Sequence, residues 1–383
     1  MDFESLFDIP IDDLHTPCYL TDARLLQKNT ALLKQIQQRT GCKILLAQKA
    51  FSMFSAYPLI RDDLAGTTAS GLFEAKLGRE HFGKEVHVFS PAYTQEDFTQ
   101  LLELCDHIVF NSFGQWKKYR QQVQDATRNI SCGIRVNPGY AEVETDLYNP
   151  CISGSRMGVP LEQMEEEGFD GLDGIHFHTM CEQNSDVLER TLDQMLPKFD
   201  KWLKRCKWVN FGGGHHITRD DYDRELLIKC IRHIRDTYGV EVYLEPGEAI
   251  ALNAGYLVTE VMDIVENGLS VLILDASAAC HMPDVLEMPY RPHILYSGKP
   301  EEKVHTYRLA GNTCLAGDVI GDYSFDHRLQ PGDKLVFCDM AIYSMVKNNT
   351  FNGVPLPDIA LYQNGKIELV KHFGYADFEG RLS

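Results

Sequence analysis

Short apolar runs alternate with longer amphipathic segments between residues 40 and 250. Each run ends in polar or glycine residues, which is typical of strands that end at a functional rim. The runs are KILLAQ (43–48), GTTASG (66–71), VHVFSP (86–91), HIVFNS (107–112), CGIRVNP (132–138), GIHFHT (174–179), WVNFGG (208–213) and VEVYLEP (240–246). GTTASG has the weakest strand character and is assigned mostly from its place in the series. The pattern predicts eight strands.

The segments between these runs have the period of helices that bury one face. In residues 72–83, 94–105 and 185–206, apolar side chains recur every three or four positions. Strands that alternate with helices predict a parallel sheet, either a closed barrel or an open doubly wound sheet. Eight units in about 210 residues favour the barrel, whose typical length is about 250 residues. We therefore predict an α/β fold with a (β/α)8 TIM barrel over residues 25–255.

The pattern changes after residue 255. Strand-like runs such as YLVTEVMDIVE, VLILD and KIELVKHF are separated by turn residues, and no long helix interrupts them. Asn364-Gly365 between two runs is a strong hairpin signal. These features predict a C-terminal all-β domain over residues 256–383. The N-terminal segment 1–24, with TPCYLTD, is expected to join it as a further strand.

Composition narrows the functional class. The chain has 383 residues, with 37 basic and 55 acidic side chains and a net charge of −18. With 44% apolar residues it can fill a core, which excludes a disordered or fibrous protein. No apolar run reaches the roughly 18 residues of a membrane span. The negative charge argues against nucleic acid or an anionic membrane as partner and favours a cationic small molecule.

The start of the chain and its cysteines indicate the compartment. The opening MDFESLFDIP is acidic and lacks an apolar signal core, so we expect no export. Eleven cysteines are scattered without a CxxC pair. In a chain of this size they indicate reduced thiols and a cytoplasmic location.

Catalytic groups of a barrel lie at the carboxyl ends of its strands. Lys49 follows the first run, where enclosure would lower the pKa of its amine and make it a nucleophile. The alternative is an ordinary strand-end lysine that reaches solvent. Arg135 lies in the fifth run. His176 and His178 alternate along the sixth, so we expect only one of them to face inward.

The last two runs end in glycines and acids. Gly212, Gly213 and Gly214 follow the seventh run, where a barrel often holds phosphate on backbone N–H groups; a tight turn would also need glycines. Glu245 and Glu248 follow the eighth run. A carboxylate there could neutralise a cationic ring nitrogen, or it could simply favour the start of a helix.

The HxH pair at residues 176–178 also suggests a metal-dependent hydrolase. Barrel hydrolases usually carry such a pair on the first strand, whereas here it lies on the sixth, and we expect no metal. An amine, a phosphate cradle, an imidazole and a carboxylate are instead the parts that pyridoxal 5'-phosphate requires.

The motifs resemble those of the fold-type III pyridoxal-phosphate enzymes, the group of alanine racemase and the ornithine and diaminopimelate decarboxylases. The similar segments lie in the same order along nearly the whole chain: TPCYLTDARLLQKN, LAQKAF, IHFHTMCE, FGGG, LEPGEA, GNTCLAGDVIG and MAIYSMVKNNTFNGVPLP. HFHTMCEQ, NFGGGHHIT and LEPGEA together are similar to the branch that decarboxylates carboxynorspermidine and carboxyspermidine.

The resemblance implies roles for individual residues. Lys49 would carry the cofactor as a Schiff base, His178 would stack on its ring, and Glu245 would bind the pyridine nitrogen. Cys314 would protonate the product as a second catalytic residue. The remaining cofactor contacts would be Arg135 near the ring, and Gly213, Gly214 and Tyr343 at the phosphate. In such enzymes the second subunit of a homodimer lends β-domain residues to the site.

Three departures from the group's pattern bear on specificity. Thr67 stands where the group has an aspartate, Glu248 where many relatives have the arginine of EPGR, and Leu315 where relatives often have an acid. The specificity of the ornithine and diaminopimelate enzymes therefore does not carry over. Glu248, Asp284 and Asp318 are candidates to bind the amines of a polycationic substrate.

The expected activity is decarboxylation of carboxynorspermidine or carboxyspermidine in polyamine biosynthesis. Glu245 argues against a racemase, because racemases of this fold place an arginine at the ring nitrogen. The alternatives are a diaminopimelate, ornithine or lysine decarboxylase, a non-catalytic pyridoxal-phosphate carrier, and the metal-dependent hydrolase. The long β-rich segment argues against the carrier.

Overall fold

The computed structural model describes residue 4, residues 7–165 and residues 167–383. The chain folds into two compact units. The barrel unit is Gln27–Ile250, and the sheet unit combines Met1–Leu26 with Ala251–Ser383. The boundaries expected after residues 24 and 255 lie near this division. What was expected for residues 1–3, 5–6 and 166 lies outside the described residues.

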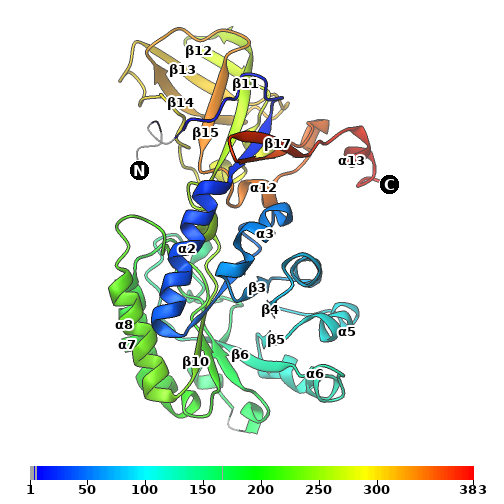
Figure 1. Ribbon diagram of the computed structural model, residues 1–383, viewed down its shortest axis with the longest axis vertical. Coiled ribbons are helices and arrows are strands. Elements are labelled where there is room, and N and C mark those ends of the chain that lie inside the picture. Colours follow the sequence, from blue (N-terminus) through cyan, green and yellow to red (C-terminus); the bar gives the residue numbers. More distant parts are fainter. Residues whose placement is uncertain (1–3, 5–6, 166) are drawn as a thin grey trace. The chain divides into compact units, whose positions relative to one another are not determined.

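The barrel unit contains a closed sheet of parallel strands (Figure 1). Neighbours pair in the order β5-β4-β3-β2-β10-β9-β8-β6, and β6 pairs back with β5. The strands are β2 Lys43–Ala47, β3 Gly66–Ala69, β4 Glu85–Phe89, β5 His107–Phe110, β6 Ser131–Asn137, β8 Gly174–His176, β9 Trp208–Asn210 and β10 Glu241–Leu244. Each of the eight predicted runs overlaps one of them, and only β4 and β6 begin one residue before their run. The predicted TIM barrel is confirmed. A short strand, β7 Val159–Pro160, pairs with β6 beside the barrel.

The helices depart from strict alternation. Those of the barrel unit are α3 Tyr57–Ile60, α4 Leu72–Leu77, α5 Gln95–Leu104, α6 Phe113–Gln124, α7 Ser185–Leu203, α8 Arg224–Tyr238 and α9 Glu248–Ala251, and α2 Ala23–Thr40 leads into it. The three predicted helical segments contain α4, α5 and α7. The amphipathic helix α2 was not predicted. Among the described residues after β6, only short 3₁₀ turns stand where a long helix was expected.

The sheet unit contains an eight-stranded sheet. Its order is β14-β13-β12-β11-β1-β16-β17, with β15 paired to β11. The strands are β1 Cys18–Asp22, β11 Gly255–Glu266, β12 Ser270–Leu274, β13 His305–Ala310, β14 Val319–Phe325, β15 Lys334–Cys338, β16 Asp358–Gln363 and β17 Lys366–Lys371. Its helices are short: α10 Ala278–His281, α11 Asp284–Glu287, α12 Ser344–Lys347 and α13 Tyr375–Glu379. The all-β prediction is confirmed, although β14 was not anticipated as a strand.

Two local predictions for the sheet unit are also confirmed. The TPCYLTD segment supplies β1, which pairs antiparallel with β11 and parallel with β16. Asn364 and Gly365 join β16 to β17, and both have positive φ (54° and 75°). This is the conformation of the two central residues of a type I′ turn, in which glycine avoids steric strain.

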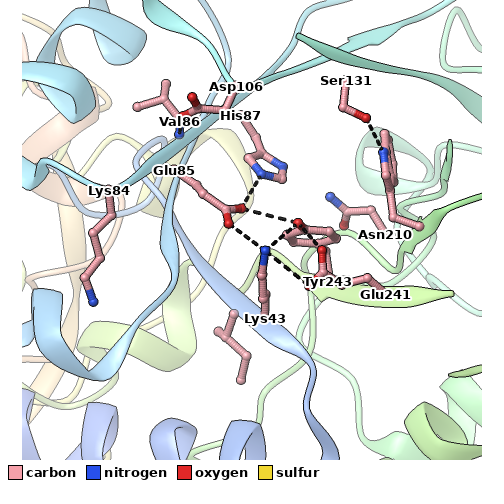
Figure 2. Close-up of polar contacts among 12 residues, drawn as sticks. Lys43, Lys84, Glu85, Val86, His87, Asp106, Ser131, Asn210, Glu241 and Tyr243 are labelled. Carbon is pink, nitrogen blue, oxygen red and sulfur yellow. Dashed lines mark hydrogen bonds and ion pairs between the residues drawn. The ribbon is translucent and has the colours of Figure 1, made fainter. Parts of the chain in front are cut away.

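An ion-pair network crosses the amino-terminal end of the barrel (Figure 2). Lys43 Nζ lies 2.6 Å from Glu85 Oε1, 3.1 Å from Glu241 Oε1 and 3.1 Å from the Tyr243 hydroxyl. His87 Nε2 lies 3.2 Å from the second Glu85 oxygen. Active sites of TIM barrels lie at the carboxyl-terminal face, so chemistry is expected at the opposite end from this network.

Among the described residues, no helix is both long and apolar enough to span a bilayer.

The sheet unit contains a buried histidine, His281, whose ring nitrogens both have hydrogen-bond partners. Its imidazole is fully buried at the end of α10. The Ser277 N–H donates to His281 Nδ1 (3.1 Å), and Nε2 lies 3.1 Å from the Pro355 carbonyl oxygen. Only the neutral ring with the proton on Nε2 satisfies both contacts. Burial lowers the pKa of His281 to about 4, against a smaller opposing effect of the Pro355 carbonyl.

We expect stability to fall on acidification because of this group. Its folded-state pKa is depressed, so its contribution is complete above the unfolded pKa of about 6.5 and is lost toward pH 4. Between pH 7 and pH 5 it should remove about 2 kcal/mol from the free energy of unfolding. Urea unfolding of wild type and His281→Gln at both pH values measures the difference. His327→Gln, at an exposed imidazole of the same unit, should show the pH dependence of wild type. If His281→Gln also kept the wild-type pH dependence, His281 would not be its cause.

Candidate active site

The carboxyl ends of neighbouring barrel strands carry a cluster of charged side chains. Lys49 follows β2, Glu245 follows β10, and His176 ends β8. Arg135 lies in β6, where it pairs in register with His176. β2, β10, β9 and β8 are consecutive in the sheet. Strands this close bring their terminal side chains into one mouth, as the sequence pattern predicted.

Lys49 is accessible to solvent but surrounded by the groups of this mouth. Enclosure lowers the pKa of its amine, and Arg135 acts in the same direction, whereas Glu245, Glu248 and Glu74 oppose it. Among the described residues, Lys49 forms no ion pair. A lysine amine with a lowered pKa and no committed partner can act as a nucleophile toward an aldehyde.

Glu245 is held by side chains from the next two strands of the sheet, β9 and β8. The residue is 8% exposed, and its carboxylate accepts a hydrogen bond from Asn210 Nδ2 (2.8 Å) and lies 3.2 Å from His176 Nε2. Burial would raise the pKa of Glu245, but the attraction and hydrogen bond of His176, together with Asn210, lower it to about 2. The site therefore holds a permanent negative charge beside Lys49.

Both histidines of the HxH pair lie at the mouth, and the prediction that only one faces inward is wrong. Strand alternation stops applying because β8 ends at His176. His176 contacts Glu245, while His178 Nδ1 accepts a hydrogen bond from the Gly213 N–H (2.7 Å). Burial lowers the pKa of both imidazoles, with Lys49 and Arg135 acting in the same direction for each. A neutral imidazole is suited to stack on a ring.

The three glycines after β9 are required by close backbone packing. A Cβ at Gly213 would lie 2.6 Å from the Glu245 carbonyl oxygen, and one at Gly214 2.0 Å from the Met180 carbonyl oxygen. Gly212 and Gly214 also have positive φ (69° and 81°). The Gly213 N–H is used by His178, whereas the Gly214 N–H has no hydrogen-bond partner among the described residues. The loop therefore presents an amide that an anion can use.

Arg135 lines the same mouth. It is 6% exposed, donates to the His178 carbonyl oxygen (3.2 Å), and its guanidinium lies 4.7 Å from the centre of the Phe89 ring. Burial lowers the pKa of Arg135 to about 10, which the attraction of Glu245 only partly opposes. The arginine therefore remains charged at neutral pH.

Cys314 and Tyr343 belong to the sheet unit. Cys314 is exposed, and its N–H donates to Asn352 Oδ1 (2.7 Å). Tyr343 precedes α12 with φ 56° and ψ −38°. Positive φ is uncommon for a bulky residue and concentrates at functional sites. The part of both residues in catalysis stays a prediction.

Two of the predicted amine-binding acids, Asp284 and Asp318, lie in the sheet unit and contact residues of that unit. Asp284 forms an ion pair with Lys347. Asp318 is 3% exposed and accepts hydrogen bonds from Ser277 Oγ (2.8 Å), Ala279 N–H (3.2 Å) and Thr313 Oγ1 (2.7 Å). Its carboxylate therefore fixes the 311–318 loop within its own unit. Glu248, partly exposed in the barrel mouth beside Lys49, is the best placed of the three.

The sequence analysis missed two residues of the mouth. Asn210 ends β9 and orients Glu245; it occupies the same strand-end position that marked the other residues, directly before the glycines. Glu74 lies in α4, accepts a hydrogen bond from the Ser70 N–H (2.6 Å) and interacts electrostatically with Lys49. Nothing in the spacing of the sequence distinguishes Glu74 from a surface acid of an amphipathic helix.

This set fits pyridoxal phosphate. The available amine can hold an aldehyde, the charged carboxylate can hold a protonated ring nitrogen, and the glycine loop leaves a cradle that a Cβ would fill. A family model described as "Pyridoxal-dependent decarboxylase, C-terminal sheet domain" matches residues 18–341. The chain belongs to the pyridoxal-dependent decarboxylases.

Relatives of this decarboxylase match over almost their whole length. It is 41% identical to a carboxynorspermidine/carboxyspermidine decarboxylase of Campylobacter jejuni, over 97% of this chain and 99% of the relative. It is 42% identical to a carboxyaminopropylagmatine decarboxylase of Synechocystis, over 97% and 96%. The crystal structure of carboxynorspermidine decarboxylase from Campylobacter jejuni, complexed with norspermidine, has a TM-score of 0.90 and 40% identity, covering 96% of this chain and 100% of that one.

A single methyl group in the glycine loop should disrupt the mouth of this decarboxylase. Gly214→Ala would force apart the loop and residues 180–181, and with them His178, so we expect pyridoxal phosphate binding to weaken by about tenfold or more. Titration of the cofactor-free protein, followed by visible absorbance, measures this.

Gly239→Ala provides the matched control. Gly239 ends α8 with φ 68°, but a Cβ there meets nothing within 4 Å. That variant should lose only about 1 kcal/mol of stability from backbone strain and bind the cofactor normally. Equal cofactor affinity in the two variants would show that the loop does not shape the site.

Proposed function

We propose that this decarboxylase acts on carboxynorspermidine and carboxyspermidine, releasing norspermidine and spermidine. The observation that carries the proposal is the full-length similarity, at 40–41% identity, to the Campylobacter jejuni enzyme and its norspermidine complex. The charge of the mouth supports it. Glu74, Glu245 and Glu248 all interact with Lys49, so the mouth favours a substrate that carries several amines.

The residues around Lys49 would hold the cofactor. Lys49 would bind it covalently through its amine, His178 would stack on its ring, and Glu245 would pair with its ring nitrogen. Gly213, Gly214 and Tyr343 are proposed for the phosphate, with Gly214 best supported because its N–H has no partner among the described residues. Arg135 would hold the position of His178, since it donates to that residue's carbonyl oxygen.

The reaction breaks the bond between the α-carbon and the carboxylate, and carbon dioxide leaves. Pyridoxal phosphate, when bound, accepts the electron pair that stays behind. Glu245 supports this step by keeping a negative charge at the ring nitrogen, which its pKa of about 2 secures at neutral pH. The α-carbon then takes up one proton, for which Cys314 Sγ is the proposed donor.

We also propose a homodimer in the cytoplasm. The family resemblance assigns Cys314 to the active site of the partner subunit, and the exposure of this thiol in a single chain is compatible with that. All eleven cysteines are unpaired, which supports a reducing compartment.

A second substrate is favoured by a specific observation. The Synechocystis relative, at 42% identity, is a carboxyaminopropylagmatine decarboxylase. The two substrate classes share an amino-acid end joined to an amine chain and differ in the distal group, an amine in one and a guanidinium in the other. Both distal groups are cations that a carboxylate such as Glu248 can bind.

A substrate panel tests the proposed function. Carbon dioxide release should be fastest with carboxynorspermidine or carboxyspermidine, and at least tenfold slower with diaminopimelate, ornithine and lysine. Carboxyaminopropylagmatine is included because the second candidate function predicts that its decarboxylation is the fastest.

Lys49→Ala should lower carbon dioxide release to background. It should also remove the visible absorbance of the bound cofactor, which borohydride abolishes in wild type. Retention of colour and turnover in that variant would contradict the role of Lys49.

Glu248 is the proposed contact for a substrate amine. Loss of a charge-assisted hydrogen bond costs about 1.5–3 kcal/mol, so Glu248→Gln should lower kcat/KM for the triamine about ten- to hundredfold. A shorter amino-acid substrate without the distal amine should be processed as by wild type. Asp284→Asn, at a carboxylate already paired with Lys347, is the comparison variant and should have the smaller effect. Equal losses on both substrates would assign Glu248 to cofactor geometry instead.

A further inference from the structure

Three side chains that are distant in the sequence meet at one end of the sheet unit. His15 precedes β1, Asp358 begins β16, and His372 follows β17. β16 pairs with both β1 and β17, and Asp358 lies beside Cys18 in register. Three adjacent strands therefore bring these residues together. They are called the His15–Asp358–His372 cluster below.

Both imidazoles point the same nitrogen at one carboxylate. His15 Nδ1 lies 3.1 Å from Asp358 Oδ2, and His372 Nδ1 lies 2.9 Å from Oδ1 and 3.1 Å from Oδ2. The Phe373 N–H adds a longer contact to Oδ1 (3.3 Å). The two rings are 5.8 Å apart at an interplanar angle of 73°. The three side chains thus converge on one point.

The burial of the carboxylate makes its charge balance significant. The side chain of Asp358 is only 4% exposed, whereas those of His15 and His372 are 71% and 61% exposed. Among the described residues, Asp358 forms ion pairs with these two histidines and with no lysine or arginine. A buried carboxylate needs a cationic or strongly donating partner. A cation bound between the two imidazoles and Asp358 would neutralise this buried carboxylate.

The spacing between the imidazole nitrogens and the carboxylate oxygens is close to that of a zinc site. One atom from each residue can be chosen so that all three lie within 4.8 Å of one another. Bonds of about 2.0–2.2 Å in a tetrahedral site place neighbouring ligand atoms about 3.4 Å apart. The nitrogen-to-oxygen distances of 2.9–3.1 Å need only small rotations of two exposed rings to reach this value.

We propose that the His15–Asp358–His372 cluster binds Zn²⁺. Two imidazole nitrogens and one carboxylate oxygen are ligands that zinc prefers, and water would complete the coordination on the exposed side. The ion would join the segment before β1, the start of β16 and the end of β17. Its role would be structural, because it would tie together three segments that are distant in the sequence.

A second group with possible metal ligands, Glu85, His87 and His107, differs in charge. Its carboxylate is already neutralised by Lys43, whose ammonium lies 2.6 Å away (Figure 2). Lys43 also pairs with Glu241 (3.1 Å). A metal ion would have to displace this ammonium, so we do not propose a metal site at Glu85, His87 and His107.

Zinc binding by the holoenzyme tests the proposal. The protein, carrying pyridoxal phosphate and no histidine tag, is stripped of metal and titrated with Zn²⁺ by calorimetry. We expect one high-affinity ion per chain and a rise in melting temperature. The double variant His15→Ala/His372→Ala should bind zinc at least tenfold more weakly and show no such rise. Both side chains are largely exposed, and circular dichroism checks that the variant is folded before it is titrated.

His327→Ala removes an exposed imidazole of the same unit that lies outside the cluster, and it should bind zinc as wild type. Co²⁺ provides an independent readout, because tetrahedral coordination by histidine gives visible absorbance that the double variant should lose. The proposal is overturned if wild type binds no zinc at micromolar concentrations, or if the double variant binds it as wild type does.

Discussion

Glu245 keeps its charge in the barrel mouth because side chains from the two preceding strands of the sheet stabilise it. Asn210 ends β9 and His176 ends β8, and β10, β9 and β8 are consecutive in the sheet. Backbone pairing fixes these strands, so the carboxylate is oriented before any ligand arrives. Lys49, after β2 on the other side of β10, faces this fixed charge. The geometry of the mouth follows from which strands are neighbours.

The two ends of the barrel use the same residue types for opposite purposes. At the amino-terminal end, Lys43 forms ion pairs with Glu85 and Glu241, and these pairs join three strands. At the carboxyl end, Lys49 forms no ion pair among the described residues, although carboxylates lie around it. An amine that is committed to an ion pair is a poor nucleophile, whereas an enclosed amine without a partner is available for covalent chemistry.

The sequence predicted best those features that depend on residues close together in the chain. Eight apolar runs located the barrel strands, and Asn364-Gly365 located a hairpin, because both depend on residues adjacent in the chain. Strand-end position also located Lys49, Arg135 and Glu245. The alternation rule, which predicted that only one of His176 and His178 faces inward, was wrong, because alternation holds only inside a strand and β8 ends between them.

Contacts between distant segments could not be predicted. Asn210 contacts Glu245 from the neighbouring strand, and the partners of Asp318 come from residues 277–279 as well as from its own loop. The sequence suggested Asp318 as an amine contact because it is an acid near Cys314, but burial decides what an acid does. His15, Asp358 and His372 have no spacing that a motif could capture, because only strand pairing makes them neighbours.

The position of β1 has a consequence for how the chain matures on the ribosome. β1 is made first, yet its two neighbours in the sheet, β11 and β16, follow the entire barrel. The barrel sequence can fold as it emerges, since all of its strands lie between residues 43 and 244. Cys18–Asp22, which is fully buried in the folded unit, lacks one of its two neighbours until β16 has been synthesised. During synthesis the edges of β1 therefore stay open to pairing with other chains, which makes this strand a segment at risk of aggregation.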